Sequence, residues 1–135
     1  DFTASVFAKL AGKCDVVTCN PPYIPIGMTP RDPEVRNHEP TVALYGGSDG
    51  LDVIRGIAKT AAMLLKSGGL LVVEHADVQG AEAGDASVVN LLKQVHLDEG
   101  LAIYVPGSLG EPLFAEVTDR LDFNQRPRFT MATRV

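Results

Sequence analysis

The sequence has no long apolar run, no basic amino-terminal segment and no excess of positive charge. No stretch approaches the roughly 18 apolar residues that a membrane-spanning helix needs, and the first ten residues lack the pattern of a signal peptide. The 12 Lys and Arg against 17 Asp and Glu give a net charge of −5, which excludes an overall basic field that would attract nucleic acid or an anionic membrane. With 135 residues, the chain is predicted to be one globular domain in the cytoplasm.

Metal-ligand spacings and disulfide spacings are also missing. The two cysteines, Cys14 and Cys19, would point to opposite faces if they lie on one strand, so we expect both to be reduced thiols. They form no CxxC pair, and the three histidines form no HxxxH pair. We therefore predict no metal site.

Two continuous apolar runs predict strands of a parallel sheet. Cys14–Cys19 lacks polar alternation, which is typical of a strand buried on both faces, and Leu70–Glu74 is a second such run. Between them, Asp49 precedes apolar residues at the helical period, which predicts a capped helix over residues 51–66 that ends at a Gly-Gly pair. Strand, helix and strand in this order indicate a right-handed crossover and the α/β class.

The last third of the chain predicts one helix and one hairpin. The helix is expected over residues 86–95, and glycines and prolines indicate a loop over residues 98–112, with a short strand at 101–105 as one interpretation. Residues 115–123 and 128–134 flank an Asn-Gln-Arg-Pro turn. We expect them to form an antiparallel hairpin at a sheet edge.

The tetrapeptide Asn20-Pro21-Pro22-Tyr23 follows the first predicted strand and opens a proline-rich loop over residues 20–50. Ligands of doubly wound sheets bind beyond the carboxyl ends of the strands, and long loops inside compact domains are usually functional or disordered. A chance Asn-Pro-Pro-aromatic sequence is expected on the order of once per thousand chains of this size. The tetrapeptide is therefore the main candidate for a functional site.

Two prolines restrict the backbone, so the Asn20 side-chain oxygen and the Pro21 carbonyl can act as two rigid acceptors for one planar NH2 group, with Tyr23 over its flat face. The lone pair of such a nitrogen is delocalised, which makes it a poor nucleophile. Acceptors that bind both hydrogens favour a pyramidal nitrogen and stabilise the positive charge that develops on it during alkylation. The alternative interpretation is a turn that ends a strand, with Tyr23 packed for structural reasons.

Several stretches resemble the HemK/PrmC family, the protein-(glutamine N5) methyltransferases that modify the Gly-Gly-Gln loop of release factors. The matching stretches are DVVTCNPPYIP at residues 15–25, HEPTVALYGGSDGLD at 38–52, GGLLVVEH at 68–75 followed by Gln79-Gly80, and LDFNQRPR at 121–128. The resemblance implies the carboxyl-terminal part of a Rossmann-like, class I S-adenosylmethionine-dependent methyltransferase domain, with parallel strands and a terminal antiparallel hairpin.

The resemblance also implies residue roles. Asn20 and Pro21 would hold the substrate glutamine amide, Pro22 would keep the loop rigid, Tyr23 would pack beside the substrate, and Asn20 would also lie near the methionine part of the cofactor. Ser5 and Val6 fall where the family places an acidic residue and then a large apolar residue beside the adenine, so both depart from that pattern.

The Gly-rich cofactor loop of the family has no counterpart in this sequence, because no GxGxxG lies between a strand and a helix. The Gly-Gly-Ser-Asp-Gly segment at residues 46–50 is interpreted as a helix entry. We therefore expect the isolated chain neither to bind the cofactor tightly nor to methylate. Two alternatives remain: methylation of adenine or guanine amino groups, which the acidic charge disfavours, and a non-catalytic fragment that keeps the fold.

Other polar residues have two interpretations each. Glu74 and His75, at the end of the second strand, are expected to face the same crevice as the tetrapeptide, either as supporting residues or as an ordinary polar strand end. Four arginines near the hairpin, at positions 120, 126, 128 and 134, could contact a polyanion such as ribosomal RNA, but charge that protects an edge strand is the preferred explanation.

Overall fold

A computed structural model describes residues 7–30, 33–38 and 40–135 of the chain. Ser5 and Val6, the residues expected beside the adenine, lie outside this range. The elements are β1 (Cys14–Cys19), α2 (Pro33–His38), α3 (Thr41–Leu44), α4 (Asp52–Leu64), β2 (Leu65–Glu74), the 3-10 turns η1 (Asp77–Gln79) and η2 (Gly84–Ala86), α5 (Val88–Lys93), β3 (Phe114–Leu121) and β4 (Pro127–Arg134).

The four strands form one sheet in the order β1-β2-β4-β3. β1 and β2 are parallel, while β4 runs antiparallel to both of its neighbours, β2 and β3. The parallel pair and the terminal hairpin confirm the predicted α/β class. β4 nevertheless lies inside the sheet, because its hydrogen bonds to β2 leave only β3 at that edge.

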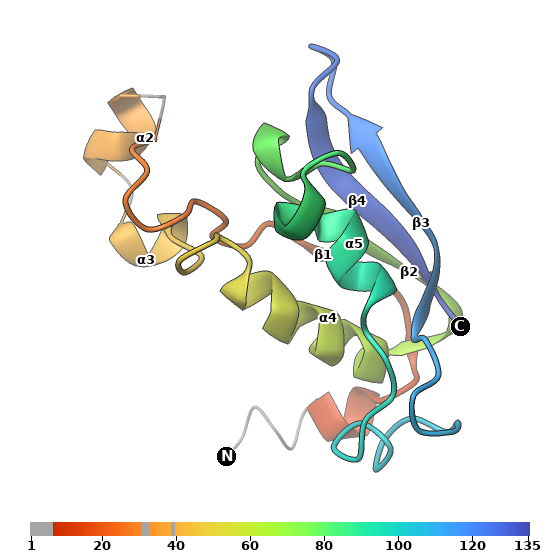
Figure 1. The fold of residues 1–135 in the computed structure, drawn as a ribbon. Helices are drawn as coiled ribbons and strands as arrows, with labels where there is room; N and C mark the ends of the chain where they lie inside the picture. Colours follow the sequence, from red (N-terminus) through yellow and green to blue (C-terminus); the bar gives the residue numbers. More distant parts are fainter. Residues whose placement is uncertain (1–6, 31–32, 39) are drawn as a thin grey trace.

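Helices α4 and α5 cover one face of the sheet (Figure 1), and the core lies between them and the strands. Alternate residues of β2, such as Leu71 and Val73, are buried against the helices, and Ile54 and Ala58 of α4 meet them. Gly68 and Gly69 do not end α4 as expected. The helix stops at Leu64, β2 begins at once, and the glycines lie where β2 loses its register with β1.

Burial of β1 differs from the prediction. Val16 is 53% exposed, and β1 forms an edge of the sheet in the part of the chain that the structure describes. Its residues Cys14, Val17 and Cys19 pack only partly against the core, and both cysteines are free thiols. A continuous apolar run indicates a strand, but whether its second face is buried depends on neighbouring elements that the run does not specify.

Two loop regions complete the fold. Residues 20–50 leave the carboxyl end of β1 as a long loop that carries the short helices α2 and α3 (Figure 1). Residues 101–105 form a turn and not a strand, because the amides of Tyr104 and Val105 both donate to the Leu101 carbonyl at 2.9 Å. No helix among the described residues is long and apolar enough to cross a membrane.

Candidate active site

The Asn20-Pro21-Pro22-Tyr23 segment (the NPPY loop) begins directly after Cys19, the last residue of β1. Asn20 is exposed, Pro21 is buried, and Pro22 and Tyr23 are half-buried. Burial of Pro21 therefore anchors the loop, while the Asn20 side chain stays accessible. A pocket of about 160 Å³ is lined by residues 20–24 together with Ala43 and Leu44 of α3.

A short parallel bridge fastens the chain after the NPPY loop to the segment before α4. The Ile24 amide donates to the Leu44 carbonyl at 2.9 Å, and the Gly46 amide donates to the Ile24 carbonyl at 2.9 Å. The Ile26 amide donates to the Gly47 carbonyl at 2.8 Å. These bonds tie the two ends of a loop that is long in sequence into one local structure.

Glycines at positions 46 and 50 permit this close approach. A Cβ on Gly46 would lie 2.5 Å from the Pro22 carbonyl oxygen, and one on Gly50 would lie 2.2 Å from the Tyr23 carbonyl oxygen. The Gly-Gly-Ser-Asp-Gly segment thus packs against the NPPY backbone in addition to forming the entry to α4. Sequence reasoning missed this contact, because glycine spacing does not identify the backbone that needs the space.

Asp49 does not cap α4 in the expected way. The cap position is Leu51, and the Asp49 carboxylate accepts the Leu51 amide at 2.9 Å and pairs with Arg55 at 2.5 Å. The hydrogen bond from Arg55 is the main reason that the pKa of Asp49 lies below its ordinary value. Asp49 therefore stabilises the turn that leads into the helix.

Tyr23 lies between charges from two strands. Glu74 at the end of β2 and Arg128 on β4 both interact with its hydroxyl, and desolvation by burial, followed by the Glu74 charge, raises the pKa of Tyr23. Tyr23, Arg126 and Arg128 share a pocket of about 440 Å³ whose other walls include apolar residues such as Ile24 and Met28. The supporting role considered for Glu74 thus has a structural basis in its contact with Tyr23.

Arg128 and Arg134 contradict the edge-charge interpretation, since both lie on β4, an internal strand. Arg128 lies beside Tyr23 and contacts Asp122 at 3.5 Å. Arg134 is buried, and its guanidinium donates to the Ala62 carbonyl at 3.0 Å. Sequence reasoning did not select Arg128 for the site. The signal that could have found it is its position as the last residue of the family-like stretch at residues 121–128.

His75 does not face the crevice. It lies just after β2 and is fully buried, with Nε2 3.0 Å from the Thr130 hydroxyl and 3.4 Å from the Asp119 carboxylate. Thr130 belongs to β4 and Asp119 to β3, so the His75 ring points toward the terminal hairpin.

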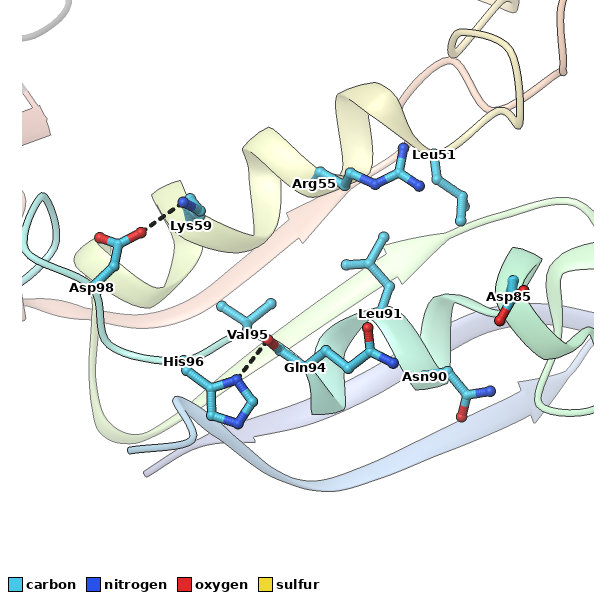
Figure 2. Close-up of a pocket in the computed structure, with 10 residues that line it drawn as sticks. All are labelled: Leu51, Arg55, Lys59, Asp85, Asn90, Leu91, Gln94, Val95, His96 and Asp98. Carbon is cyan, nitrogen blue, oxygen red and sulfur yellow. Dashed lines mark hydrogen bonds and ion pairs between the residues drawn. The ribbon is translucent and has the colours of Figure 1, made fainter. Parts of the chain in front are cut away.

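A larger pocket of about 600 Å³ lies between α4 and α5 (Figure 2). None of its lining residues belongs to the NPPY loop. Its two long cations are paired, Lys59 with Asp98 at 2.7 Å and Arg55 with Asp49 and Asp52. At the NPPY loop, by contrast, two prolines restrict the backbone, and Glu74 and Arg128 converge on Tyr23. The NPPY loop is therefore the candidate active site.

The described residues fit a methylation cofactor in part. The pocket beside Asn20, at about 160 Å³, is smaller than the roughly 300–1,000 Å³ of typical ligand sites, so it suits the reacting groups and not a whole nucleoside. Among the described residues, no group of three or more His, Cys, Asp or Glu could hold a metal ion.

Comparisons with known proteins identify relatives along nearly the whole chain. The chain is 39% identical over 132 residues to a release factor glutamine methyltransferase of Streptomyces coelicolor, a match that covers 96% of the chain and 39% of that protein. It is 39% identical over 136 residues to one of Mycolicibacterium smegmatis, covering 100% of the chain and 41% of that protein.

A third relative carries a different name. The chain is 49% identical over 73 residues to a 4-amino-L-phenylalanine/4-methylamino-L-phenylalanine methyltransferase of Streptomyces pristinaespiralis, covering 54% of the chain and 25% of that protein. No protein-family model matches the chain. The chain thus spans about two fifths of the length of the first two relatives.

Proposed function

From the membership of this chain in the HemK/PrmC family of release factor glutamine methyltransferases, we propose that it is the carboxyl-terminal part of the catalytic domain of such an enzyme. The enzyme transfers a methyl group from S-adenosylmethionine to the side-chain amide nitrogen of the glutamine in the Gly-Gly-Gln motif of peptide-chain release factors, in the cytoplasm. The observation that carries the proposal is the NPPY loop, held by its backbone at the carboxyl end of β1 with Asn20 exposed.

In the proposed mechanism, the Asn20 side-chain oxygen and the Pro21 carbonyl accept one hydrogen each from the substrate amide. Pro22 restricts the loop, and Tyr23, fixed between Glu74 and Arg128, packs against the flat face of the amide. These acceptors interact more strongly with the nitrogen as positive charge develops on it, so they lower the barrier more than they stabilise the bound substrate.

The bound cofactor would supply an electrophilic methyl group on a sulfonium. Its sulfur would keep the electron pair of the broken carbon–sulfur bond, and the Asn20 and Pro21 acceptors would hold the amide nitrogen that takes the methyl group. The amide proton leaves to solvent after transfer, so no strong general base is needed. Asn20 would lie beside the methionine part of the cofactor. The isolated chain, which lacks a GxGxxG loop, is proposed to be inactive.

A small aromatic amine is the second candidate acceptor. The relative from Streptomyces pristinaespiralis is named for methylation of 4-amino-L-phenylalanine. The nitrogen of an arylamine, like that of a primary amide, carries two hydrogens and a lone pair that is delocalised into a neighbouring π system. Amino groups of nucleic acid bases share this chemistry, but the net charge of −5 disfavours a polyanionic substrate.

The test is methyl transfer from labelled cofactor by the complete protein that contains this sequence. The acceptors are a release-factor domain with the Gly-Gly-Gln motif, the same domain with that glutamine changed to alanine, 4-amino-L-phenylalanine, and duplex DNA. We expect label only in the unmodified release-factor domain. Label in the amino acid or in DNA, without label in the protein, would overturn the proposed substrate.

A further inference from the structure

Gln79 is a buried amide that joins three separate segments of the chain. It lies in η1, just after β2, and is 1% exposed. Its Oε1 accepts the Ala76 amide at 3.0 Å, and its Nε2 donates to the Tyr23 carbonyl at 3.0 Å and faces the Asp49 carbonyl at 3.5 Å. One side chain therefore contacts both the NPPY loop and the turn that enters α4.

The donor and acceptor ends of this amide are not interchangeable. The Ala76 N–H requires an acceptor, and the two carbonyl oxygens require donors, so only one orientation of the Gln79 amide satisfies its partners. The space is also filled, because a Cβ on Gly50 would lie 2.7 Å from Gln79 Nε2 and 2.2 Å from the Tyr23 oxygen. Loss of the amide would leave a buried carbonyl without its donor.

The segment that carries Gln79 is itself tied to the hairpin. The His75 Nδ1 lies 2.8 Å from the Ala76 carbonyl, to which it donates, while His75 Nε2 lies 3.0 Å from the Thr130 hydroxyl. The Asp119 carboxylate accepts the Ala81 amide at 2.8 Å. Strands β3 and β4 thus hold both ends of the segment, which fixes Gln79 where it meets the NPPY backbone.

We propose that Gln79 is a positioning residue for the NPPY loop: by holding the Tyr23 carbonyl, it keeps the Asn20 and Pro21 acceptors aimed at the substrate nitrogen. The proposal rests on the proposed function. It gives a role to the buried Gln79 side chain, which takes no part in the proposed methyl transfer. Its consequence is that loss of the Gln79 donor slows methyl transfer while leaving cofactor affinity unchanged.

The test compares Gln79→Met and Gln79→Glu with the matched change Gln94→Glu at an exposed glutamine, each in the complete protein. We expect Gln79→Met to lower kcat by about 10²-fold, the usual effect of displacing reacting groups by about 1 Å. The dissociation constant for the cofactor should stay within about twofold, and Gln94→Glu should match the wild type in both. Equal losses of kcat and cofactor affinity, or no loss, would overturn the proposal.

Gln79→Glu supplies a readout that a packing defect would not move. Its carboxylate can accept from Ala76 but cannot donate to the Tyr23 carbonyl, whereas the protonated acid can donate. The activity of this variant relative to the wild type should therefore rise as the pH falls from about 8 to about 6, since burial beside carbonyl oxygens raises the pKa of a carboxyl group. A ratio that does not change with pH would contradict the donor role.

Amide hydrogen exchange separates this proposal from the proposed function. Exchange at the Ile24 and Gly46 amides, which close the bridge after the NPPY loop, should be at least about tenfold faster in Gln79→Met than in the wild type. Unchanged exchange would overturn the positioning role even if the protein methylates another acceptor. If neither variant folds, hydrogen exchange of the Gln79 side-chain NH2 in the wild type is the test. Slow exchange supports the hydrogen bond from Gln79 to the Tyr23 carbonyl, and exchange at the rate of a free amide overturns the proposal.

Discussion

Changing Asn20 to alanine should slow catalysis strongly and leave the fold intact. The Asn20 side chain is exposed at the end of β1 and belongs to no part of the buried core. Its removal creates no cavity, so we expect the free energy of unfolding to change by no more than about 0.5 kcal/mol. In the proposed mechanism, the same change removes one of two fixed acceptors for the developing charge on nitrogen.

The size of the catalytic loss follows from comparable charge-stabilising contacts. Removal of one preorganised hydrogen-bonding group in an active site costs about 10²–10³ in kcat, which is about 2.7–4 kcal/mol of transition-state stabilisation. The second acceptor, the Pro21 backbone carbonyl, persists in the variant, so activity should fall without vanishing. Binding of the cofactor, measured by calorimetry, should weaken far less than kcat falls.

Two further variants make the test specific. Asn20→Asp keeps an acceptor oxygen but loses the NH2 donor, so it should retain more activity than Asn20→Ala if the residue acts as an acceptor. Asn37→Ala, at an exposed residue of α2, is the matched control and should behave as the wild type. The assay is single-turnover methyl transfer by the complete protein. Equal losses in turnover and cofactor binding, or lower activity of the Asp variant than of the Ala variant, would refute the acceptor role.

Three other measurements test the structure. Burial raises the pKa of the Cys19 thiol to about 11, so its alkylation by iodoacetamide at about pH 8 should be about 10²-fold slower than that of free cysteine; equal rates would show an open thiol. The Arg55 contact lowers the pKa of Asp49, so it stabilises the protein at pH values above 3.8, the ordinary pKa of this carboxyl group. The stability difference between wild type and Arg55→Gln, at most about 1 kcal/mol for this exposed pair, should therefore disappear as the pH falls through the lowered pKa, and a difference that persists in acid would contradict it. Ile54→Ala should reduce the free energy of unfolding by about 2–5 kcal/mol in urea, whereas Val53→Ala at an exposed position should cost less than about 1 kcal/mol; similar costs would mean that the two side chains are buried alike.

The sequence alone determined the local elements and the candidate segment. Apolar runs and helical periodicity are properties of neighbouring residues, which is why β1, α4 and the hairpin of β3 and β4 were predicted close to their observed positions. The NPPY loop was predicted for the same reason, since two prolines restrict the backbone wherever they stand. The family resemblance added the expected chemistry to that segment.

Only the tertiary structure decided which distant residues meet. It placed Arg128 beside Tyr23, Gly50 against the Tyr23 carbonyl, and Gln79 between them and the entry to α4. It also turned His75 away from the crevice and left Val16 exposed. Such contacts depend on strand order, register and close packing between segments, and these are set by the whole fold, because no short stretch of sequence encodes its partner across space.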